Sequence, residues 1–257
     1  MTVTTARTNE AQRGLRVERG AKRVRAYLGG ELVADTTRPL LVWEVPYYPA
    51  YYLPVADVRA HLLHPDGAVA HSPRRGDGRT FTVRAGGKEA SRAAVRYEES
   101  RLEELRDVVR FDWDAMDAWF EEDEQVFTHP RDPYTRVDIL PSSRHVRVEV
   151  DGATIAESAK PTLLFETGLP ERYYLPKPHV RLDLLTATDT VSHCPYKGQA
   201  EYWSVRVDDT VHADLAWSYR TPLPESQKIA GLISFYNERV DLYVDGERQD
   251  RPTTKFS

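Results

Sequence analysis

The chain carries the stretch His193-Cys194-Pro195-Tyr196-Lys197-Gly198, and the segment Arg172-Tyr173-Tyr174-Leu175-Pro176 precedes it. A second version of both segments lies earlier, as His71-Ser72-Pro73-Arg74-Arg75-Gly76 after Tyr51-Tyr52-Leu53-Pro54. Matching residues of the two versions stand 122 positions apart, as His71 and His193 do. A constant spacing of this length indicates that the fold is built from two copies of one unit.

The match between the copies extends well beyond these segments. Residues 24–76 align with residues 146–198 without a gap, and 19 of the 53 positions are identical. Phe111 and Phe235 continue the match at a spacing of 124. The unit is too long for a solenoid repeat, so we read it as a duplicated domain. We predict a disordered leader at 1–13, a first domain at 14–132, a linker at 133–143 and a second domain at 144–257.

The composition excludes several classes of protein. The 257 residues carry a net charge of −5, with 40% hydrophobic and 29% charged residues, so no general nucleic-acid footprint is present. The single cysteine allows neither an internal disulfide nor a four-cysteine zinc site. The first 20 residues hold Arg and Glu without an apolar run, unlike a signal peptide or a membrane span. We expect a cytoplasmic protein with no metal, no cofactor, no nucleic-acid partner and no membrane partner.

The local patterns predict mainly short antiparallel strands. Residues 146–150 alternate apolar and polar side chains, and Asp151-Gly152 then supplies a type I′ turn pair before residues 153–157 return. Residues 180–184 alternate in the same way. Two segments favour a short helix instead, residues 98–109 in the first copy and residues 224–233 in the second. This order of elements argues against a doubly wound α/β fold.

The second copy resembles a known family. Its runs ERYYLP at 171–176, VRLDLL at 180–185, HCPYKGQAEYWSV at 193–205 and DLAWSYRTPLPESQKIAGLISFYNERVDLYVDGE at 214–247 resemble the domain of unknown function 427 (DUF-427). The first copy is similar over a comparable length, with HSPRRGDGRTF at 71–81 in place of the HCPYKG pattern. The resemblance implies two tandem β-tent-like domains of short antiparallel strands, each with one short α-helix. We expect the two domains to pair with each other within the chain.

The family that the second copy resembles also bears an old nucleotidyltransferase label. A nucleotidyltransferase needs paired carboxylates to hold Mg²⁺, normally after a Gly-Ser helix start. The chain has no Gly-Ser pair, and its Asp-x-Asp pair is Asp112 with Asp114. The counterparts of these two residues in the second copy are Tyr236 and Glu238. Nucleotide transfer is therefore a less favoured alternative to the two functions described below, a small-molecule pocket and a non-catalytic interaction module.

Four ionisable residues of the second copy are the candidates for a site. Arg181 and Lys197 could hold an anion, because arginine offers a bidentate fork and lysine a point charge. His193 could act as proton donor or acceptor, with Glu166 as the second catalytic residue orienting Arg181 or His193. The first-copy counterparts are Glu44, Arg59, His71 and Arg75. The alternative is that these side chains form structural ion pairs between the sheets.

Aromatic residues complete the predicted site. One ring of a Tyr-Tyr pair on an extended segment points inward and the other outward, so Tyr174 could wall a pocket. The other candidates for this wall are Tyr196, Trp217 and Tyr219. In the first copy, Tyr52 is the counterpart of Tyr174. Cys194 beside His193 is read as a small core residue rather than a nucleophile, because neighbouring side chains on a strand point to opposite faces.

The sequence thus predicts a small-molecule pocket in each domain, with the better pocket in the second. Its ligand would be a polar or anionic metabolite with a planar part, and metal-free acid–base catalysis centred on His193 would be the natural chemistry. The main alternative is a non-catalytic binding or interaction module in which the Arg, Glu and His residues are structural.

Overall fold

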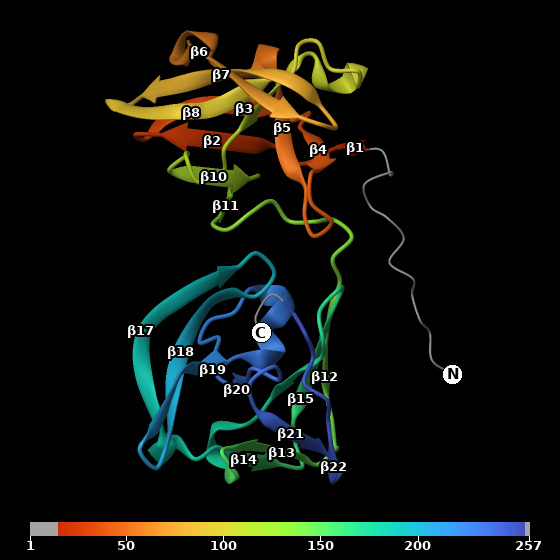
Figure 1. Ribbon diagram of the computed structural model, residues 1–257, viewed down its shortest axis with the longest axis vertical. Helices are drawn as coiled ribbons and strands as arrows, with labels where there is room; N and C mark the ends of the chain where they lie inside the picture. The colour runs from red at the N-terminus through yellow and green to blue at the C-terminus, as the bar shows by residue number, and fades with distance from the viewer. Residues whose placement is uncertain (1–14, 255–257) are drawn as a thin grey trace. The chain divides into compact units, whose positions relative to one another are not determined.

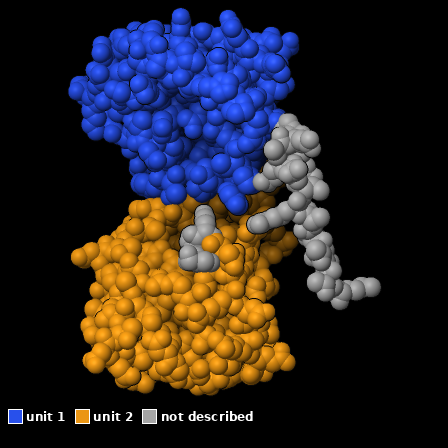
Figure 2. Space-filling model, in the orientation of Figure 1, with its two compact units in different colours: residues 1–132 blue, residues 133–257 orange. Residues whose placement is uncertain are grey.

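The computed structural model describes residues 15–254, and the chain divides into two compact units, residues 1–132 and 133–257 (Figures 1 and 2). The expected disordered leader at 1–13 lies outside the described residues. Both units are built from antiparallel strands, so the expected mainly β fold is confirmed. Within residues 15–254, no helix is long and apolar enough to cross a bilayer.

The first unit consists of two antiparallel sheets. One has the order β1-β4-β5-β9-β8-β7-β6, and the other has the order β11-β10-β2-β3. The strands are β1 (Arg16–Arg19), β2 (Val24–Leu28), β3 (Glu31–Thr36), β4 (Leu40–Trp43), β5 (Ala50–Pro54), β6 (Leu63–Ser72), β7 (Gly76–Ala85), β8 (Lys88–Arg96), β9 (Val108–Phe111), β10 (Ala118–Glu121) and β11 (Glu124–Val126). Short 3-10 turns at Val55–Asp57, Ala60–Leu62 and Glu103–Leu105 connect them.

The second unit repeats this order of strands. Its sheets are β12-β15-β16, β17-β18-β19-β20 and β14-β13-β21-β22. The strands are β12 (Val137–Pro141), β13 (Val146–Val150), β14 (Ala153–Ser158), β15 (Thr162–Glu166), β16 (Arg172–Tyr174), β17 (Leu185–Cys194), β18 (Gly198–Val207), β19 (Thr210–Ser218), β20 (Ile233–Phe235), β21 (Asp241–Val244) and β22 (Glu247–Arg248). The 3-10 turns are Lys177–His179, Leu182–Leu184 and Pro224–Ile229.

The pairing between the middle strands is the same in both units. Leu53 of β5 pairs with Val109 of β9, and their counterparts Leu175 and Ile233 form an isolated antiparallel bridge. The shorter pairing in the second unit leaves two sheets where the first has one continuous sheet of seven strands. The registers thus support the sequence alignment at the level of single residues.

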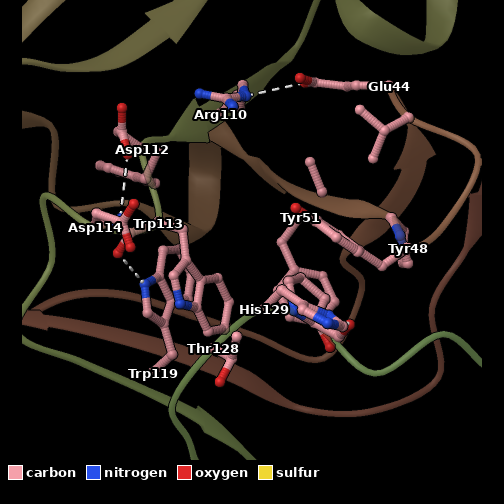
Figure 3. Close-up of a pocket in the computed structure, with 15 residues that line it drawn as sticks. Glu44, Tyr48, Tyr51, Arg110, Asp112, Trp113, Asp114, Trp119, Thr128 and His129 are labelled. Carbon is pink, nitrogen blue, oxygen red and sulfur yellow. Dashed lines mark hydrogen bonds and ion pairs between the residues drawn. The ribbon is translucent and has the colours of Figure 1, made fainter. Parts of the chain in front are cut away.

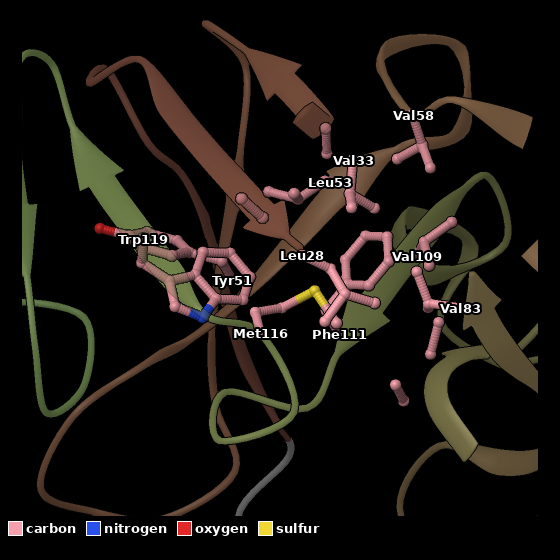
Figure 4. Packing of buried hydrophobic residues seen from close by; sticks show 14 of the residues in the cluster. Leu28, Val33, Tyr51, Leu53, Val58, Val83, Val109, Phe111, Met116 and Trp119 are labelled. Carbon is pink, nitrogen blue, oxygen red and sulfur yellow. The ribbon is translucent and has the colours of Figure 1, made fainter. Parts of the chain in front are cut away.

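Alternation of side chains produces the cores. Along β2 and along β13 the buried and half-buried positions alternate, which puts one face of each strand into the core. Figure 4 shows the packing in the first unit, where Leu28, Val33 and Leu53 meet Val83 and Val109. Burial of each such side chain contributes about 1.5–3 kcal/mol of stabilising free energy, so each core stabilises the fold of its own unit.

Glycine and aspartate close the hairpins as expected. Asp151 and Gly152 have φ values of 50° and 80°, which the type I′ turn requires. Gly29 plays the same part in the first unit, and a Cβ there would lie 2.6 Å from the carbonyl oxygen of Ala85. A larger residue at position 29 would therefore strain the turn and push it away from the backbone of Ala85 and Gly86.

Four expected local structures are wrong. Residues 98–109 form the 3-10 turn Glu103–Leu105 and the beginning of β9, because the edges of β5 and β8 recruit that strand. Residues 224–233 contain only the 3-10 turn Pro224–Ile229 before β20, and residues 180–184 contain the 3-10 turn Leu182–Leu184 instead of a strand. Residues 137–141 of the expected linker form β12, which pairs with β15.

Candidate functional site

Part of the predicted second-copy cluster does come together. Lys197, in the turn after β17, donates a hydrogen bond to the carboxylate of Glu166 at the end of β15. The side chains of Lys197 and Glu166 are 10% and 9% exposed. Burial alone would lower the pKa of Lys197, but Cys194, Glu166 and Tyr174 raise it above its ordinary value. The surroundings of Lys197 therefore favour its ammonium form.

Aromatic rings seal this cluster. The indole Nε1 of Trp217 donates to the hydroxyl of Tyr174 over 3.1 Å, and the two rings meet edge to face. Burial raises the pKa of Tyr174 to about 12 and also raises that of Tyr219. Tyr174, Trp217 and Tyr219 are each less than a tenth exposed, whereas Tyr196 is half-buried. The predicted aromatic wall thus lies mainly in the core.

Arg181 and His193 do not join the cluster. The Arg181 guanidinium forms an exposed ion pair with Asp183 over 2.6 Å. His193 is exposed on β17, whereas its neighbour Cys194 packs against the buried aromatic cluster. Adjacent side chains of a strand point to opposite faces, which explains the separation. The expected convergence of Arg181, His193 and Glu166 on one hollow is wrong.

The first unit repeats this division. Glu44 accepts hydrogen bonds from the hydroxyl of Tyr52 over 2.6 Å and from the guanidinium of Arg75 over 2.5 Å. Arg110 of β9 joins them, with its Nε 2.9 Å from a Glu44 oxygen. The other two predicted residues point elsewhere, since Arg59 lies 3.9 Å from Glu31 and the exposed His71 contacts Asp77 over 2.6 Å.

The Glu44 cluster borders a pocket of about 250 Å³ in the first unit (Figure 3). We expected the better pocket in the second unit, and the pocket of Figure 3 lies in the first, where it combines residues that the copies share, such as Glu44 and Tyr51, with residues that differ. The lining is Glu44, Val45, Tyr48, Pro49, Ala50, Tyr51, Arg110, Phe111, Asp112, Trp113, Asp114, Trp119, Thr128, His129 and Pro130. Of the predicted Arg, Glu, His and aromatic cluster only Glu44 lines it, together with Asp112 and Asp114, the carboxylate pair considered for nucleotide transfer.

Two pairs of stacked rings wall the pocket. Trp113 and Trp119 stack with 4.8 Å between ring centroids and 4° between planes. Tyr48 and His129 stack at 3.9 Å and 12°. Figure 3 shows the tryptophan pair at one side of the pocket and Tyr48 with His129 at the other. Such an arrangement presents flat apolar faces that suit a planar molecule.

Hydrogen bonds hold these rings in place. The Nε1 of Trp119 donates to the carbonyl oxygen of Trp113 over 3.0 Å, and Nδ1 of His129 lies 2.7 Å from the carbonyl oxygen of Pro130. Behind the rings, the Tyr51 hydroxyl donates to the buried carboxylate of Glu121 over 2.7 Å. The walls are therefore ordered by their own hydrogen bonds before any ligand arrives.

The charged groups of the pocket are mostly carboxylates. Glu44 and Arg110 form an ion pair at one edge, and Asp112 and Asp114 are exposed at another. Within residues 15–254, the side chain of Asp114 makes no hydrogen bond and no ion pair. One guanidinium and three carboxylates thus line the pocket, which gives it a negative formal charge when His129 is neutral.

Comparison with known proteins places the chain in a family but supplies no activity. No curated protein matches the sequence. The profile described as a domain of unknown function, DUF427, matches residues 16–122 and again residues 138–246. These two matches together span most of the chain, and each falls on one of the two sets of equivalent strands described above. The chain therefore belongs to the DUF427 family and carries that domain twice.

Proposed function

We propose that the first unit binds a small organic molecule with a planar part in the pocket of Figure 3. The observation that carries this proposal is the pair of ring stacks, Trp113 with Trp119 and Tyr48 with His129, around one cavity. The cavity volume of about 250 Å³ lies just below the usual range for ligand pockets, about 300–1,000 Å³. A ligand the size of one substituted ring is therefore the best match.

Several properties of the walls favour binding. Trp113 and Tyr48 line the pocket and are half-buried, so part of each side chain remains accessible. A ring that stacks on such a face gains about 0.5–1.5 kcal/mol beyond its burial. Because hydrogen bonds already order Trp119 and His129, the ligand loses little free energy in arranging its own site.

Binding without chemistry is the function we propose. The acid–base pair expected in the second copy lacks its geometry, because Glu166 is held by Lys197 and His193 is exposed. His129, which lines the pocket, has its Nδ1 against a backbone carbonyl and its ring stacked on Tyr48. These contacts suit a wall residue better than a proton carrier.

The test uses the chain's own tryptophans. The sequence has five, so an isotope-labelled full-length protein gives five indole N–H signals in a two-dimensional NMR spectrum. A library of planar polar compounds is added in turn. We expect a binding compound to shift the signals of Trp113 and Trp119, while those of Trp203 and Trp217 in the second unit stay in place.

Variants then locate the binding site. Trp113→Ala removes one wall and should weaken a found ligand about tenfold, the equivalent of one lost ring contact. Tyr47→Ala is the matched control, because Tyr47 is an exposed aromatic next to Tyr48 that does not line the pocket. An unchanged affinity in Trp113→Ala, or shifts confined to Trp203 and Trp217, would refute the proposal.

A further inference from the structure

The pocket of the first unit lies where the second unit keeps an arginine. Ala50 lines the pocket and pairs with Val42 across β5 and β4. The counterpart of Ala50 is Arg172, which pairs with Leu164 across β16 and β15 in the same register. The two positions are therefore equivalent in sequence and in sheet geometry. One copy has a methyl group where the other has a long cationic side chain.

Arg172 shows what this place can hold. Its Nη1 and Nη2 atoms donate to the two carboxylate oxygens of Glu238, both over 2.7 Å. The guanidinium also lies over the rings of Trp217 and Tyr236, with its Cζ 5.6 Å and 5.9 Å from their centroids. The side chains of Arg172 and Glu238 are only 8% and 0% exposed. A planar cation is thus clamped by an acid and flanked by aromatic faces.

The first unit retains the acid but lacks the arginine. Asp114 stands at the position of Glu238, between the matched pairs Phe111/Phe235 and Asp117/Asp241. It lines the pocket, and no side chain of the described residues pairs with it. The other cation nearby is Arg110, which stands at the position of the buried Ser234 and is turned to Glu44 instead.

We propose that the pocket binds a planar cation of the guanidinium or amidinium class, which takes the place that Arg172 fills in the second unit. This inference rests on the proposed function and names the ligand class for the same pocket. Asp114 accepts the paired N–H groups, and the rings of Trp113 and Tyr48 cover the faces of the cation. Figure 3 shows Asp114 beside Trp113 at one side of the pocket.

Charge and shape both favour this class over the anion expected from the sequence. Three carboxylates and one guanidinium line the pocket; Glu44 pairs with Arg110, which leaves Asp112 and Asp114 as the carboxylates without a cation in the lining. A guanidinium is flat, gives up its water more readily than an ammonium group, and matches a carboxylate with two parallel hydrogen bonds. Its flat faces stack on aromatic rings, which a tetrahedral ammonium group does less well.

The experiment compares three probes of nearly equal shape and different charge. Benzamidinium, benzamide and benzoate are each titrated into the full chain, and the indole signals of Trp113 and Trp119 report binding. We expect benzamidinium to bind at least about tenfold more tightly than benzamide, because a charged donor pair on Asp114 strengthens the hydrogen bonds. Benzoate should bind most weakly of the three.

Two variants test the place of the cation. Asp114→Asn keeps the shape, removes the charge and should weaken benzamidinium about tenfold while leaving benzamide unchanged. Asp189→Asn is the control, since Asp189 is an exposed carboxylate of the second unit. Ala50→Arg restores the arginine of the second unit and should abolish binding of all three probes. Asp114→Asn alone decides the matter if Ala50→Arg does not fold.

The outcomes separate this inference from the proposed function. If benzamide or benzoate binds as tightly as benzamidinium, and Trp113→Ala weakens it, the pocket binds planar molecules but the cation class is wrong. If none of the probes and no compound of the planar library moves the two indole signals, the proposed function itself is wrong. Agmatine and a capped arginine amide distinguish the source, since tighter binding of agmatine indicates a free metabolite and tighter binding of the amide indicates a protein side chain.

Discussion

The two units share a frame and differ in what fills it. Both have a carboxylate at the end of the same strand, and a tyrosine and a cation beside it: Glu44, Tyr52 and Arg75 in one, Glu166, Tyr174 and Lys197 in the other. Beyond that frame, a buried arginine in the second unit is replaced by an open pocket in the first. Residues shared by the copies thus form the frame, and residues that differ, such as Ala50 and Arg172, change what fills it.

Removal of the second unit's arginine should have the largest effect on stability. Arg172→Ala leaves the fully buried Glu238 without its cation, and the loss of one partner of a buried pair costs about 3–5 kcal/mol. Urea unfolding followed by the indole signals of Trp203 and Trp217 measures the change in free energy. A double change of Arg172 and Glu238 to leucine should cost much less, and equal losses in the single and double variants would contradict this account.

Loss of a cation from the shared frame should destabilise the two units unequally. Lys197→Met leaves Glu166 buried without its only ion-pair partner in the described residues and should cost about 3 kcal/mol. Arg75→Met should cost about 1 kcal/mol, because Arg110 still pairs with Glu44 and both groups are more exposed. Urea unfolding of the two variants gives the comparison, and a larger loss in Arg75→Met would overturn it.

The acid of the second unit should make stability depend on pH. Burial alone would raise the pKa of Glu238, but hydrogen bonds from Arg172 and Thr254 lower it below the ordinary value of 4.5. Its stabilising contribution is therefore complete above pH 4.5 and is lost as the pH falls through the lower folded-state pKa. Glu238→Gln should reduce the difference in unfolding free energy between about pH 7 and about pH 3. An unchanged difference would refute this assignment.

We expect the smallest effect from nucleotides, which should leave the stability of the protein unchanged. ATP with Mg²⁺ meets Asp112, Asp114 and an arginine already paired with Glu44 in the pocket of the first unit, so we expect no rise in melting temperature. A Mg²⁺-dependent rise that disappears in Asp112→Asn would favour the nucleotidyltransferase alternative. ATP without Mg²⁺ is the control.

Much of the frame could be predicted from the sequence because it depends on local chemistry. Alternation at residues 146–150 followed by the Asp151-Gly152 pair strongly favours a hairpin, and β13 and β14 form it. The helix predicted at residues 98–109 does not form. The Leu, Glu and Arg content of this segment favours a helix, but pairing with β5 and β8 stabilises the extended strand β9 more. Propensity is a weak preference that tertiary pairing overrides.

The site was harder to predict, since identity between the copies pointed to the wrong residues. Arg181 and His193 match Arg59 and His71, yet all four side chains are exposed or paired locally. The pocket has shared residues such as Glu44 and Tyr51 at its walls, but its other lining residues stand mostly at positions where the copies differ. Its signal was present in the sequence as small-for-large and aromatic-for-polar exchanges, such as Ala50 for Arg172 and Trp113 for Asn237.

The attachment of Arg172 to its strand has a thermodynamic consequence for the first unit. A tethered side chain reaches its acid without surrendering translational freedom, whereas a free molecule gives up an estimated 4–15 kcal/mol on association. To bind the proposed free ligand, the first unit would need contacts that the second does not need. The first unit has Tyr48, Trp113 and Trp119 where the second has Pro170, Asn237 and Tyr243. This larger aromatic surface would offset the free energy that a ligand loses because it is not covalently attached to the chain.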